Sequence, residues 1–360
     1  MSAPRFWRRL EERLRRLAPQ HEHPLHEPRQ LAWVIQRERA RSDRNGQPFC
    51  LLALMLRPGE SCTEATRRLL DICRSRLRVT DEIGWLTADT LAIVLPETPP
   101  AGAWKVADDL CVAMPEHLEP PACRVYFYPS GSGGQPLPLA EEELAPHRSE
   151  ATVGLEGLFC RSLPVWKRAL DLLGGVTLAV AALPALALIA AAVKFTSPGP
   201  VLFRQLRAGL GGRPFVMYKF RTMSVDAESL RHALRALNEL DGPAFKIKAD
   251  PRITRLGRLL RSTSLDELPQ LWNVIRGDMS LVGPRPLPCD EQAACTPWQQ
   301  RRLDVTPGLT CIWQVSGRSN VSFAEWVRMD LQYANERSLG RDLQLLAATV
   351  PAVLVRRGAY

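Results

Sequence analysis

Two adjacent carboxylates, Asp266 and Glu267, lie at the centre of the densest group of polar residues in the sequence. They belong to the segment Ser264–Pro286, SLDELPQLWNVIRGDMSLVGPRP, in which Arg285 follows them, and Arg261 precedes the segment. A carboxylate can attack phosphorus and form an acyl phosphate, which divides one difficult transfer into two easier ones. Positive charge must lie nearby, because otherwise the carboxylate repels an anionic phosphate. The segment therefore predicts phosphoryl-transfer chemistry, although an adjacent Asp-Glu pair alone is also typical of an exposed helix surface.

Magnesium fits this chemistry, because it takes oxygen ligands and bridges one or two carboxylates to substrate phosphates. We therefore expect Mg²⁺ to be bound by Asp266 and Glu267. The nine cysteines include no C-x-x-C pair, which argues against zinc and indicates core thiols in a reducing cytosol. No histidine follows His232, so a histidine-based triad in the last third is excluded. The histidines at 21, 23 and 26 are typical of a polar linker.

A long apolar stretch, Ala169–Val193, precedes these residues and carries Asp171 as its only charge. Its length exceeds that of an ordinary membrane helix. Pro184 lies inside it and kinks a helix, which leaves two arms that are too short to cross about 30 Å of hydrocarbon. Basic residues at both ends, Lys167 and Lys194 among them, indicate that the helix enters and leaves on the same face. We favour a re-entrant membrane helix broken at Pro184 over a spanning helix or a buried helix of a soluble protein.

Residues 29–128 predict a compact α/β domain, in which apolar runs of strand length alternate with segments of helical periodicity. The expected strands are Leu51–Leu56, Leu91–Leu95 and Val125–Tyr128, and the expected helices are Glu64–Leu77 and Ala103–Met114. Proline, glycine and serine then dominate residues 129–138. We place a linker at 129–166 and begin the second, helix-rich domain at Lys167.

Basic amphipathic segments lie at the N-terminus and just before the two carboxylates. The formal net charge of +9 favours an anionic partner. In residues 1–28, arginines surround apolar residues at helical spacing, which is equally typical of a helix on an anionic membrane and of a packed surface helix. Ile253–Leu265 shows the same pattern, with a solvated charged face as the alternative. Nucleic acid is not expected as a partner, because the arginine-rich segments coincide with apolar helices and lack interleaved aromatic residues.

The second half of the chain resembles the bacterial sugar transferases, the monotopic phosphoglycosyl transferases that start lipid-linked glycan assembly. The likeness covers residues 167–360 and includes the apolar helix and the block from Arg261 to Pro286. The other matching motifs are SPGPVLFRQ (Ser197–Gln205), YKFRTM (Tyr218–Met223), TPGLTCIWQVSGR (Thr306–Arg318) and the terminal GAY (Gly358–Tyr360). The resemblance implies a helix-rich α+β monotopic membrane domain with a re-entrant helix.

The resemblance also implies a reaction. Asp266 would attack the sugar-bearing phosphate of a UDP-sugar, expel UMP and hold a phospho-sugar, which undecaprenyl phosphate would then take. Glu267 would support Mg²⁺ and proton transfer. A hexose is favoured, as UDP-glucose or UDP-galactose, and the product would start an exopolysaccharide, a capsule or an O-antigen-type glycan. The implied location is the bacterial inner membrane, with both domains facing the cytoplasm.

Cations of the family's motifs can be carried over residue by residue. Lys219, Arg221, Arg261 and Arg285 match basic positions that would contact substrate phosphates, since positioned cations supply most of the stabilisation in phosphoryl transfer. Arg318 and Asp330 match later positions that would line the nucleotide-sugar pocket. A structural ion pair is the alternative for each of these basic residues, and it weighs most for Arg318.

Residues 29–128 resemble a degenerate GGDEF domain of the diguanylate cyclase type, which sets the chain apart from larger family members with four further membrane helices. The match runs through Arg78–Thr98, RVTDEIGWLTADTLAIVLPET, in which Thr87–Leu91 occupies the signature loop. Both glycines of that loop are replaced, so a nucleotide cannot approach the backbone closely. Thr90 replaces its glutamate, and the first strand carries no acidic residue. Cyclase activity is therefore not expected.

Arg78 and Asp81 keep the R-x-x-D spacing at which cyclases bind cyclic di-GMP, five residues before the signature loop. An arginine can fork onto a guanine edge or a phosphate while an aspartate accepts from guanine nitrogens. The alternatives are that both residues are remnants or that Arg78 pairs with a surface carboxylate. This leaves open a second function, a membrane-anchored cyclic-dinucleotide receptor with a non-catalytic transferase-like domain. A homodimer is also left open.

Overall fold

The computed structural model describes residues 23–57, 64–115, 117–130, 153–227, 229–231, 234, 238–239, 241–245, 247, 250–316 and 321–354. The chain divides into two compact units. The first comprises Met1–Pro129 and Pro138–Val153, and the second Ser130–Leu137 and Gly154–Tyr360. The described residues do not include the predicted amphipathic segment up to residue 22, residues 131–152 of the predicted linker, Arg318 or the terminal GAY motif.

A six-stranded sheet organises the first unit, with the strand order β1-β3-β4-β2-β5-β6. Strand β2 pairs antiparallel with β4 and β5, and β1 pairs parallel with β3. The strands are β1 (Leu25–His26), β2 (Phe49–Met55), β3 (Glu82–Thr87), β4 (Thr90–Leu95), β5 (Ala122–Tyr128) and β6 (Val153–Gly154). The predicted strands at 51–56, 91–95 and 125–128 are confirmed, and the unit is α/β.

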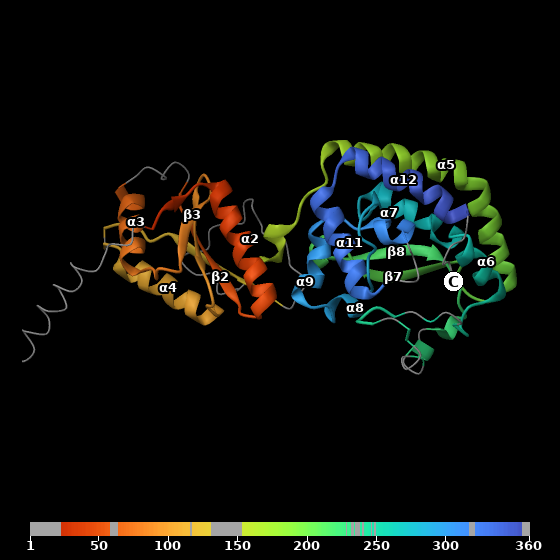
Figure 1. Cartoon of the computed structure of the whole chain (residues 1–360), viewed down its shortest axis with the longest axis horizontal. Helices are drawn as coiled ribbons and strands as arrows, with labels where there is room; N and C mark the ends of the chain where they lie inside the picture. Colours follow the sequence, from red (N-terminus) through yellow and green to blue (C-terminus); the bar gives the residue numbers. More distant parts are fainter. Residues whose placement is uncertain are drawn as a thin grey trace, which may run out of the picture. The chain divides into compact units, whose positions relative to one another are not determined.

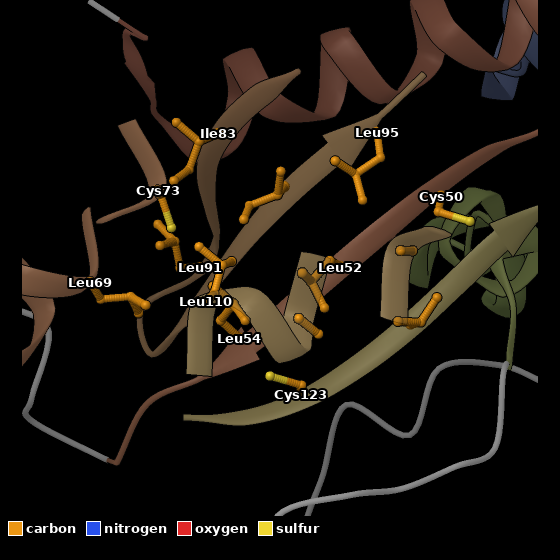
Figure 2. Close-up of a cluster of buried hydrophobic side chains, with 14 of the residues drawn as sticks. Cys50, Leu52, Leu54, Leu69, Cys73, Ile83, Leu91, Leu95, Leu110 and Cys123 are labelled. Atoms are coloured by element: carbon orange, nitrogen blue, oxygen red, sulfur yellow. The ribbon is translucent and has the colours of Figure 1, made fainter. Parts of the chain in front are cut away.

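Helices α2 (Pro28–Asn45), α3 (Glu64–Arg76) and α4 (Pro100–Ala113) accompany this sheet (Figure 1). Six of the seven residues of β2 are buried, so both of its faces are covered. Leu52 and Leu54 point to the face where Leu69 of α3 and Leu110 of α4 complete one core (Figure 2). The predicted helices at 64–77 and 103–114 are therefore confirmed.

The second unit is rich in helices and carries two small sheets. Strands β7 (Leu202–Ala208) and β8 (Pro214–Phe220) form an antiparallel hairpin, and β9 (Ser280–Val282) pairs parallel with β10 (Gly308–Thr310). The helices are α5 (Val165–Thr196), α6 (Arg255–Ser262), α7 (Leu271–Arg276), α8 (Cys289–Ala293), α9 (Pro297–Gln300), α10 (Ile312–Ser316), α11 (Phe323–Glu336) and α12 (Leu339–Leu354). Short 3-10 helices are η2 (Leu155–Phe159), η3 (Leu210–Gly212), η4 (Val225–Ala227), η5 (Ser229–Arg231), η7 (Leu265–Gln270) and η8 (Arg301–Asp304).

Helix α5 contains the predicted apolar stretch and continues through Pro184. Among the described residues it is the one helix long and apolar enough to cross a membrane, and only 11% of its most apolar part is buried. Its first arm packs Gly175 against Val274 and Ile275 of α7. Its last arm packs Ile189 and Val193 into a cluster with residues of β8 and α6. Figure 1 shows α5 bending along the second unit between these two contacts.

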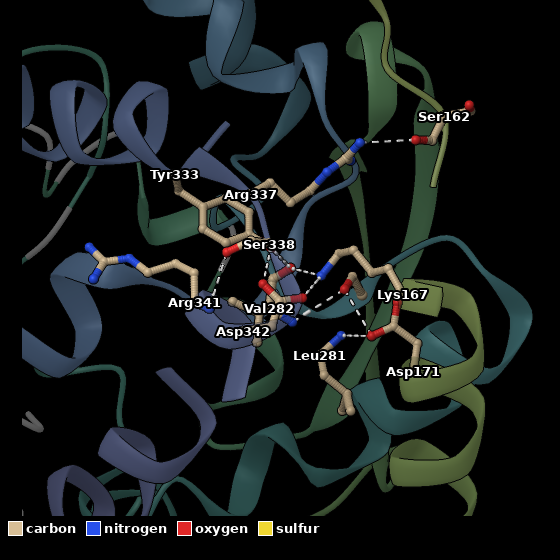
Figure 3. Close-up of polar contacts among 11 residues, drawn as sticks. Ser162, Lys167, Asp171, Leu281, Val282, Tyr333, Arg337, Ser338, Arg341 and Asp342 are labelled. Carbon is tan, nitrogen blue, oxygen red and sulfur yellow. Dashed lines mark hydrogen bonds and ion pairs between the residues drawn. The ribbon is translucent and has the colours of Figure 1, made fainter. Parts of the chain in front are cut away.

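A buried polar network fixes the start of α5 (Figure 3). The Lys167 ammonium donates to Asp342 Oδ2 at 2.5 Å and to the Val282 carbonyl at 3.0 Å. The hydroxyl of Tyr333 donates to Asp342 Oδ1 at 2.8 Å. One turn later on α5, Asp171 Oδ1 accepts from the backbone N–H of Leu281 at 2.8 Å. The apolar helix is therefore tied to strand β9, which leads directly to Arg285.

Candidate active site

The two carboxylates lie on η7, a short 3-10 helix that the local sequence enforces. Ser264 precedes it in the left-handed region at φ 57°, an uncommon conformation for a residue with a side chain. Pro269 lies inside η7, where its missing N–H favours a short, tight turn over a longer α-helix. Asp266 points inward from this turn and is only 6% exposed.

Glu267 and Arg285 form a two-pronged ion pair, although eighteen residues separate them. Arg285 Nη1 donates to Glu267 Oε2 at 3.2 Å, and Nη2 donates to Oε1. Burial alone would raise the pKa of Glu267, but the paired guanidinium outweighs it and lowers that pKa. Glu267 is therefore held as a charged carboxylate that orients Arg285.

Asp266 differs from its neighbour because its carboxylate accepts no hydrogen bond from the part of the chain that the structure describes. Burial, with the adjacent Glu267 charge, raises the pKa of Asp266 to about 6, and Lys219, Arg261 and Arg285 pull it back. An ionised oxygen that is buried, unpaired and surrounded by cations has lone pairs available for a new bond.

Lys219 lies on β8, the strand that packs against η7. Burial and repulsion from Arg207 and Arg261 lower the pKa of its ammonium to about 7, while Asp266 and Glu267 oppose the shift. The Lys219 ammonium on the hairpin and the two carboxylates on η7 therefore interact electrostatically. Arg207 was not predicted as a site residue from the sequence. It donates to the Pro286 carbonyl at 2.8 Å, beside Arg285.

Arg261 reaches the site from helix α6, which packs tightly onto the end of the hairpin. Thr254 caps α6 by accepting from the Gly257 N–H at 2.9 Å. A Cβ on Gly257 would lie 2.1 Å from the Thr222 carbonyl oxygen, so this close approach requires glycine. One turn later Arg261 Nε donates to Thr222 Oγ1 at 2.9 Å. The packing directs the Arg261 guanidinium to the charge cluster of Asp266.

Arg221 contacts the C-terminal end of the apolar helix α5. Its Nη2 donates to the carbonyl and the hydroxyl of Ser197, the residue that ends α5, at 2.8 and 2.7 Å. Within the described residues its Nε and Nη1 are buried and have no hydrogen-bond partner. Two buried guanidinium nitrogens without acceptors are costly unless an acceptor lies beside them, and phosphate oxygens fit that need.

Arg302, which was not predicted from the sequence, positions Arg285 through a hydrogen bond to its backbone. It donates through Nη2 to the Arg285 carbonyl and through Nε to Asp330 Oδ2 at 2.9 Å. Asp330 is 1% exposed and pairs with Arg302, and its place in a nucleotide-sugar pocket stays a prediction. No local signal in the RRLD segment marks Arg302, because its role depends on contacts far away in sequence.

Two glycines allow the Arg285 loop to lie this close to its neighbours. A Cβ on Gly308 would lie 2.0 Å from the Gly283 nitrogen, and one on Gly283 would lie 2.5 Å from the Thr306 carbonyl oxygen. Only glycine permits such an approach of two backbones. The loop after β9 is thereby pressed against the start of β10, and Arg285 projects from it toward Glu267.

Arg78 and Asp81 lie in the first unit and form a closed turn. The Asp81 carboxylate accepts from the Arg78 backbone N–H at 2.8 Å, and the Asp81 N–H donates to the Arg78 carbonyl at 2.8 Å. Asp81 is 4% exposed, whereas Arg78 is exposed. A guanine edge would have to compete with this turn for a carboxylate that is almost fully buried.

The residues around Asp266 fit a magnesium ion. Among the described residues no group of three or more His, Cys, Asp or Glu side chains could hold a metal. Mg²⁺ needs fewer, because it usually takes one or two carboxylates and completes its shell with phosphates and water. Neither Asp266 oxygen accepts a hydrogen bond from the described residues, and the Glu267 oxygens keep lone pairs beyond those used by Arg285.

The chain matches the family model for bacterial sugar transferases over residues 162–356. It is 45% identical over 195 residues to the galactosyl transferase CpsE of Streptococcus agalactiae, covering 54% of this chain and 43% of that protein. It is 44% identical to the UDP-galactose-lipid carrier transferase of Erwinia amylovora, covering 54% and 41%. It is also 44% identical to the UDP-glucose:undecaprenyl-phosphate glucose-1-phosphate transferase of Caulobacter vibrioides, covering 54% and 72%. The chain thus spans less than half of the first two relatives.

The solved structures that match with low scores include two diguanylate cyclase proteins. A DGC protein from Thermotoga maritima gives a TM-score of 0.28 at 12% identity, covering 30% of this chain and 85% of that chain. The diguanylate cyclase SiaD from Pseudomonas aeruginosa, solved with its activator SiaC, gives 0.26 at 18% identity, covering 34% and 58%. Similarity of this extent carries no argument, and the degenerate GGDEF assignment of the first unit stays a prediction.

Proposed function

Since the chain belongs to the bacterial sugar transferase family, we propose that it is a phosphoglycosyl transferase that moves a sugar 1-phosphate from a UDP-sugar to undecaprenyl phosphate. The observation that carries this proposal is the contrast within the carboxylate pair. Glu267 is held by Arg285, whereas Asp266 is buried, unpaired among the described residues and surrounded by Lys219 and Arg261. The names of the similar enzymes support the donor and the lipid acceptor. A hexose, as glucose or galactose, is the sugar we propose.

The reaction proceeds in two displacements at phosphorus. An Asp266 oxygen forms a bond to the sugar-bearing phosphorus, and the bond to UMP breaks, with UMP keeping the electron pair. The resulting acyl phosphate holds the phospho-sugar covalently. A phosphate oxygen of undecaprenyl phosphate then bonds to the same phosphorus, and the bond to Asp266 breaks. The product is undecaprenyl-diphospho-sugar, which starts a surface glycan.

The surrounding side chains stabilise the charge that these steps develop. Lys219, Arg261 and Arg285 lie near Asp266 and are placed to contact the donor phosphates. Arg221, whose Nε and Nη1 have no hydrogen-bond partner among the described residues, lies at the end of α5. Mg²⁺ bound by Asp266 and Glu267 would neutralise phosphate charge and let an anionic carboxylate approach. The pKa of Asp266 at about 6 leaves it mostly ionised, and therefore nucleophilic, at neutral pH.

The membrane helix is proposed to be re-entrant, with both units on the cytoplasmic face of the inner membrane. Both arms of α5 pack on the same unit, through Gly175 near one end and Val193 near the other. Large apolar side chains between them, such as Leu178 and Leu183, are about half exposed at 49% and 58%. A helix whose two ends contact one compact unit returns to the side from which it entered.

One experiment tests the reaction and the nucleophile together. Detergent-purified full chain is mixed with a panel of UDP-sugars and Mg²⁺, first without lipid and then with undecaprenyl phosphate. Without lipid we expect up to one UMP per enzyme and a sugar-phosphate adduct on the Asp266 peptide. Asp266→Asn should give neither, while the exposed Asp290→Asn serves as the control that should react normally. Stoichiometric release by Asp266→Asn, or an adduct at another residue, would refute the assignment.

A further inference from the structure

Two thiols of the first unit lie within reach of each other, and neither takes part in the chemistry proposed above. The Sγ atoms of Cys111, on α4, and Cys123, on β5, are 3.7 Å apart. Cys123 is 4% exposed and lies in the core shared by α3, α4 and the sheet (Figure 2). Cys111 is only partly buried at the edge of that core. Both thiols are free, so the pair is a reduced dithiol with one accessible member.

The environment distinguishes Cys111 from the other core thiols. The hydrogen bond with Cys123 lowers the pKa of Cys111 to about 7, against burial and the repulsion of Asp108. The same hydrogen bond, together with burial, raises the pKa of Cys123. Burial raises the pKa of Cys50 and of Cys73 to about 12, so these remain unreactive thiols. The thiolate is the form that attacks an oxidant, so partial exposure and the hydrogen bond from the Cys123 thiol both favour reaction at Cys111.

We propose that Cys111 and Cys123 form a reversible disulfide, a redox modification site of the first unit that a hydroperoxide oxidises. The Cys111 thiolate attacks a peroxide oxygen, the O–O bond breaks, and a sulfenic acid forms as the oxidant leaves as water or an alcohol. The Cys123 sulfur then attacks the sulfenic sulfur. The S–S bond forms, the S–O bond breaks, and water leaves with the thiol proton. Two thiols are oxidised by two electrons, and one hydroperoxide is reduced.

The geometry requires only a small movement. The sulfur atoms must close from 3.7 Å to about 2.05 Å, which side-chain rotation and a slight shift of α4 can supply. The disulfide would bind α4 covalently to β5 across the short connection between them. It would also remove the accessible thiolate from the surface of the unit. A dithiol reducing agent reverses the reaction by thiol–disulfide exchange.

The test uses reduced full-chain protein and hydrogen peroxide as the probe. Peptide mapping without reductant should show a cross-link between the peptides of Cys111 and Cys123, which dithiothreitol removes. In Cys123→Ser, the sulfenic acid at Cys111 should persist and be trapped by a cyclic 1,3-diketone. Cys289 provides the internal reference, because it is partly buried and its pKa is raised by burial. We expect Cys111 to react at least about tenfold faster than Cys289.

Three results would overturn the proposal: a Cys111 no faster than Cys289, oxidation of Cys111 without a cross-link to Cys123, or a cross-link to another cysteine. The wild-type peptide map decides these points even if Cys123→Ser folds poorly. A circular dichroism spectrum before and after peroxide confirms that the cross-link forms in folded protein.

Discussion

Replacing the proposed nucleophile should stabilise the protein while abolishing turnover. Asp266 has a pKa of about 6 in the folded chain and 3.8 as its ordinary value, chiefly because of burial. The folded state therefore binds this proton more tightly than the unfolded state. The contribution of Asp266 to stability is full below the unfolded value and is lost as the pH rises through about 6. Asparagine is neutral at every pH and avoids that loss.

The magnitude follows from the shift. A rise of about two pKa units, at about 1.36 kcal/mol each, amounts to about 3 kcal/mol of destabilisation at neutral pH. Asp266→Asn should recover most of it at about pH 8 and almost none at about pH 4. For a unit of this size the gain corresponds to roughly 6–12 °C in thermal midpoint. Under the proposed mechanism, Asp266 stays charged and has no hydrogen-bond partner among the described residues, and this readiness for reaction costs stability.

The assay compares thermal unfolding of wild type and variant in the same detergent across this pH range. Other titrating groups occur in both proteins, so the difference between the two curves isolates Asp266. Asp250→Asn is the matched control, because Asp250 is paired with the buried Arg252 at 2.6 Å and this pairing lowers its pKa despite burial. Its loss leaves a buried guanidinium without its charge partner and should cost about 3–5 kcal/mol.

The reasoning fails if Asp266→Asn lowers the midpoint at neutral pH as Asp250→Asn should. That result would mean that Asp266 is a paired, structural carboxylate. A gain that does not vary with pH would also contradict the argument, because it would arise from something other than ionisation.

Four further expectations concern catalysis, topology and regulation. Arg302→Lys keeps the charge but cannot bridge Asp330 and the Arg285 carbonyl, so kcat/KM in the UMP-release assay should fall about 10- to 100-fold while the protein stays folded. Unchanged kinetics would show that Arg285 needs no support from Arg302. The pH profile of kcat/KM for the UDP-sugar should rise through about 6 and fall through about 7, and Lys219→Arg should remove the alkaline limb because arginine keeps its charge. Inside-out vesicles expose the cytoplasmic face, so an impermeant maleimide should label both Cys160, before α5, and Cys289, after it. Labelling of the two cysteines from opposite sides would establish a spanning helix. Calorimetric titration of the full chain with cyclic di-GMP should show no binding, because the Asp81 carboxylate is held in its turn. Saturable binding by the wild type that Arg78→Ala abolishes would restore the receptor hypothesis.

The fold was predictable from sequence wherever hydrophobic periodicity is strong. The apolar runs at β2 and β4 and the amphipathic α3 and α4 were found because each buries a continuous face. Helix α2 was missed because eighteen mostly polar residues hide a narrow stripe of Leu31, Val34 and Ile35. The bounds of α5 extend beyond the predicted apolar stretch because the buried Lys167 and its partners continue the helix into the protein.

The sequence by itself determined the reactive carboxylate pair and the family, because adjacency and ordered motifs are local properties of the chain. Only the tertiary structure decided how the two carboxylates differ. The loop after β9 brings Arg285 onto Glu267, which lowers the pKa of Glu267, whereas burial raises the pKa of Asp266, which has no hydrogen-bond partner among the described residues. The tertiary structure also pairs the buried Asp330 with Arg302. Such pairings depend on distances between residues far apart in the chain, and burial makes each of them strong enough to set a charge.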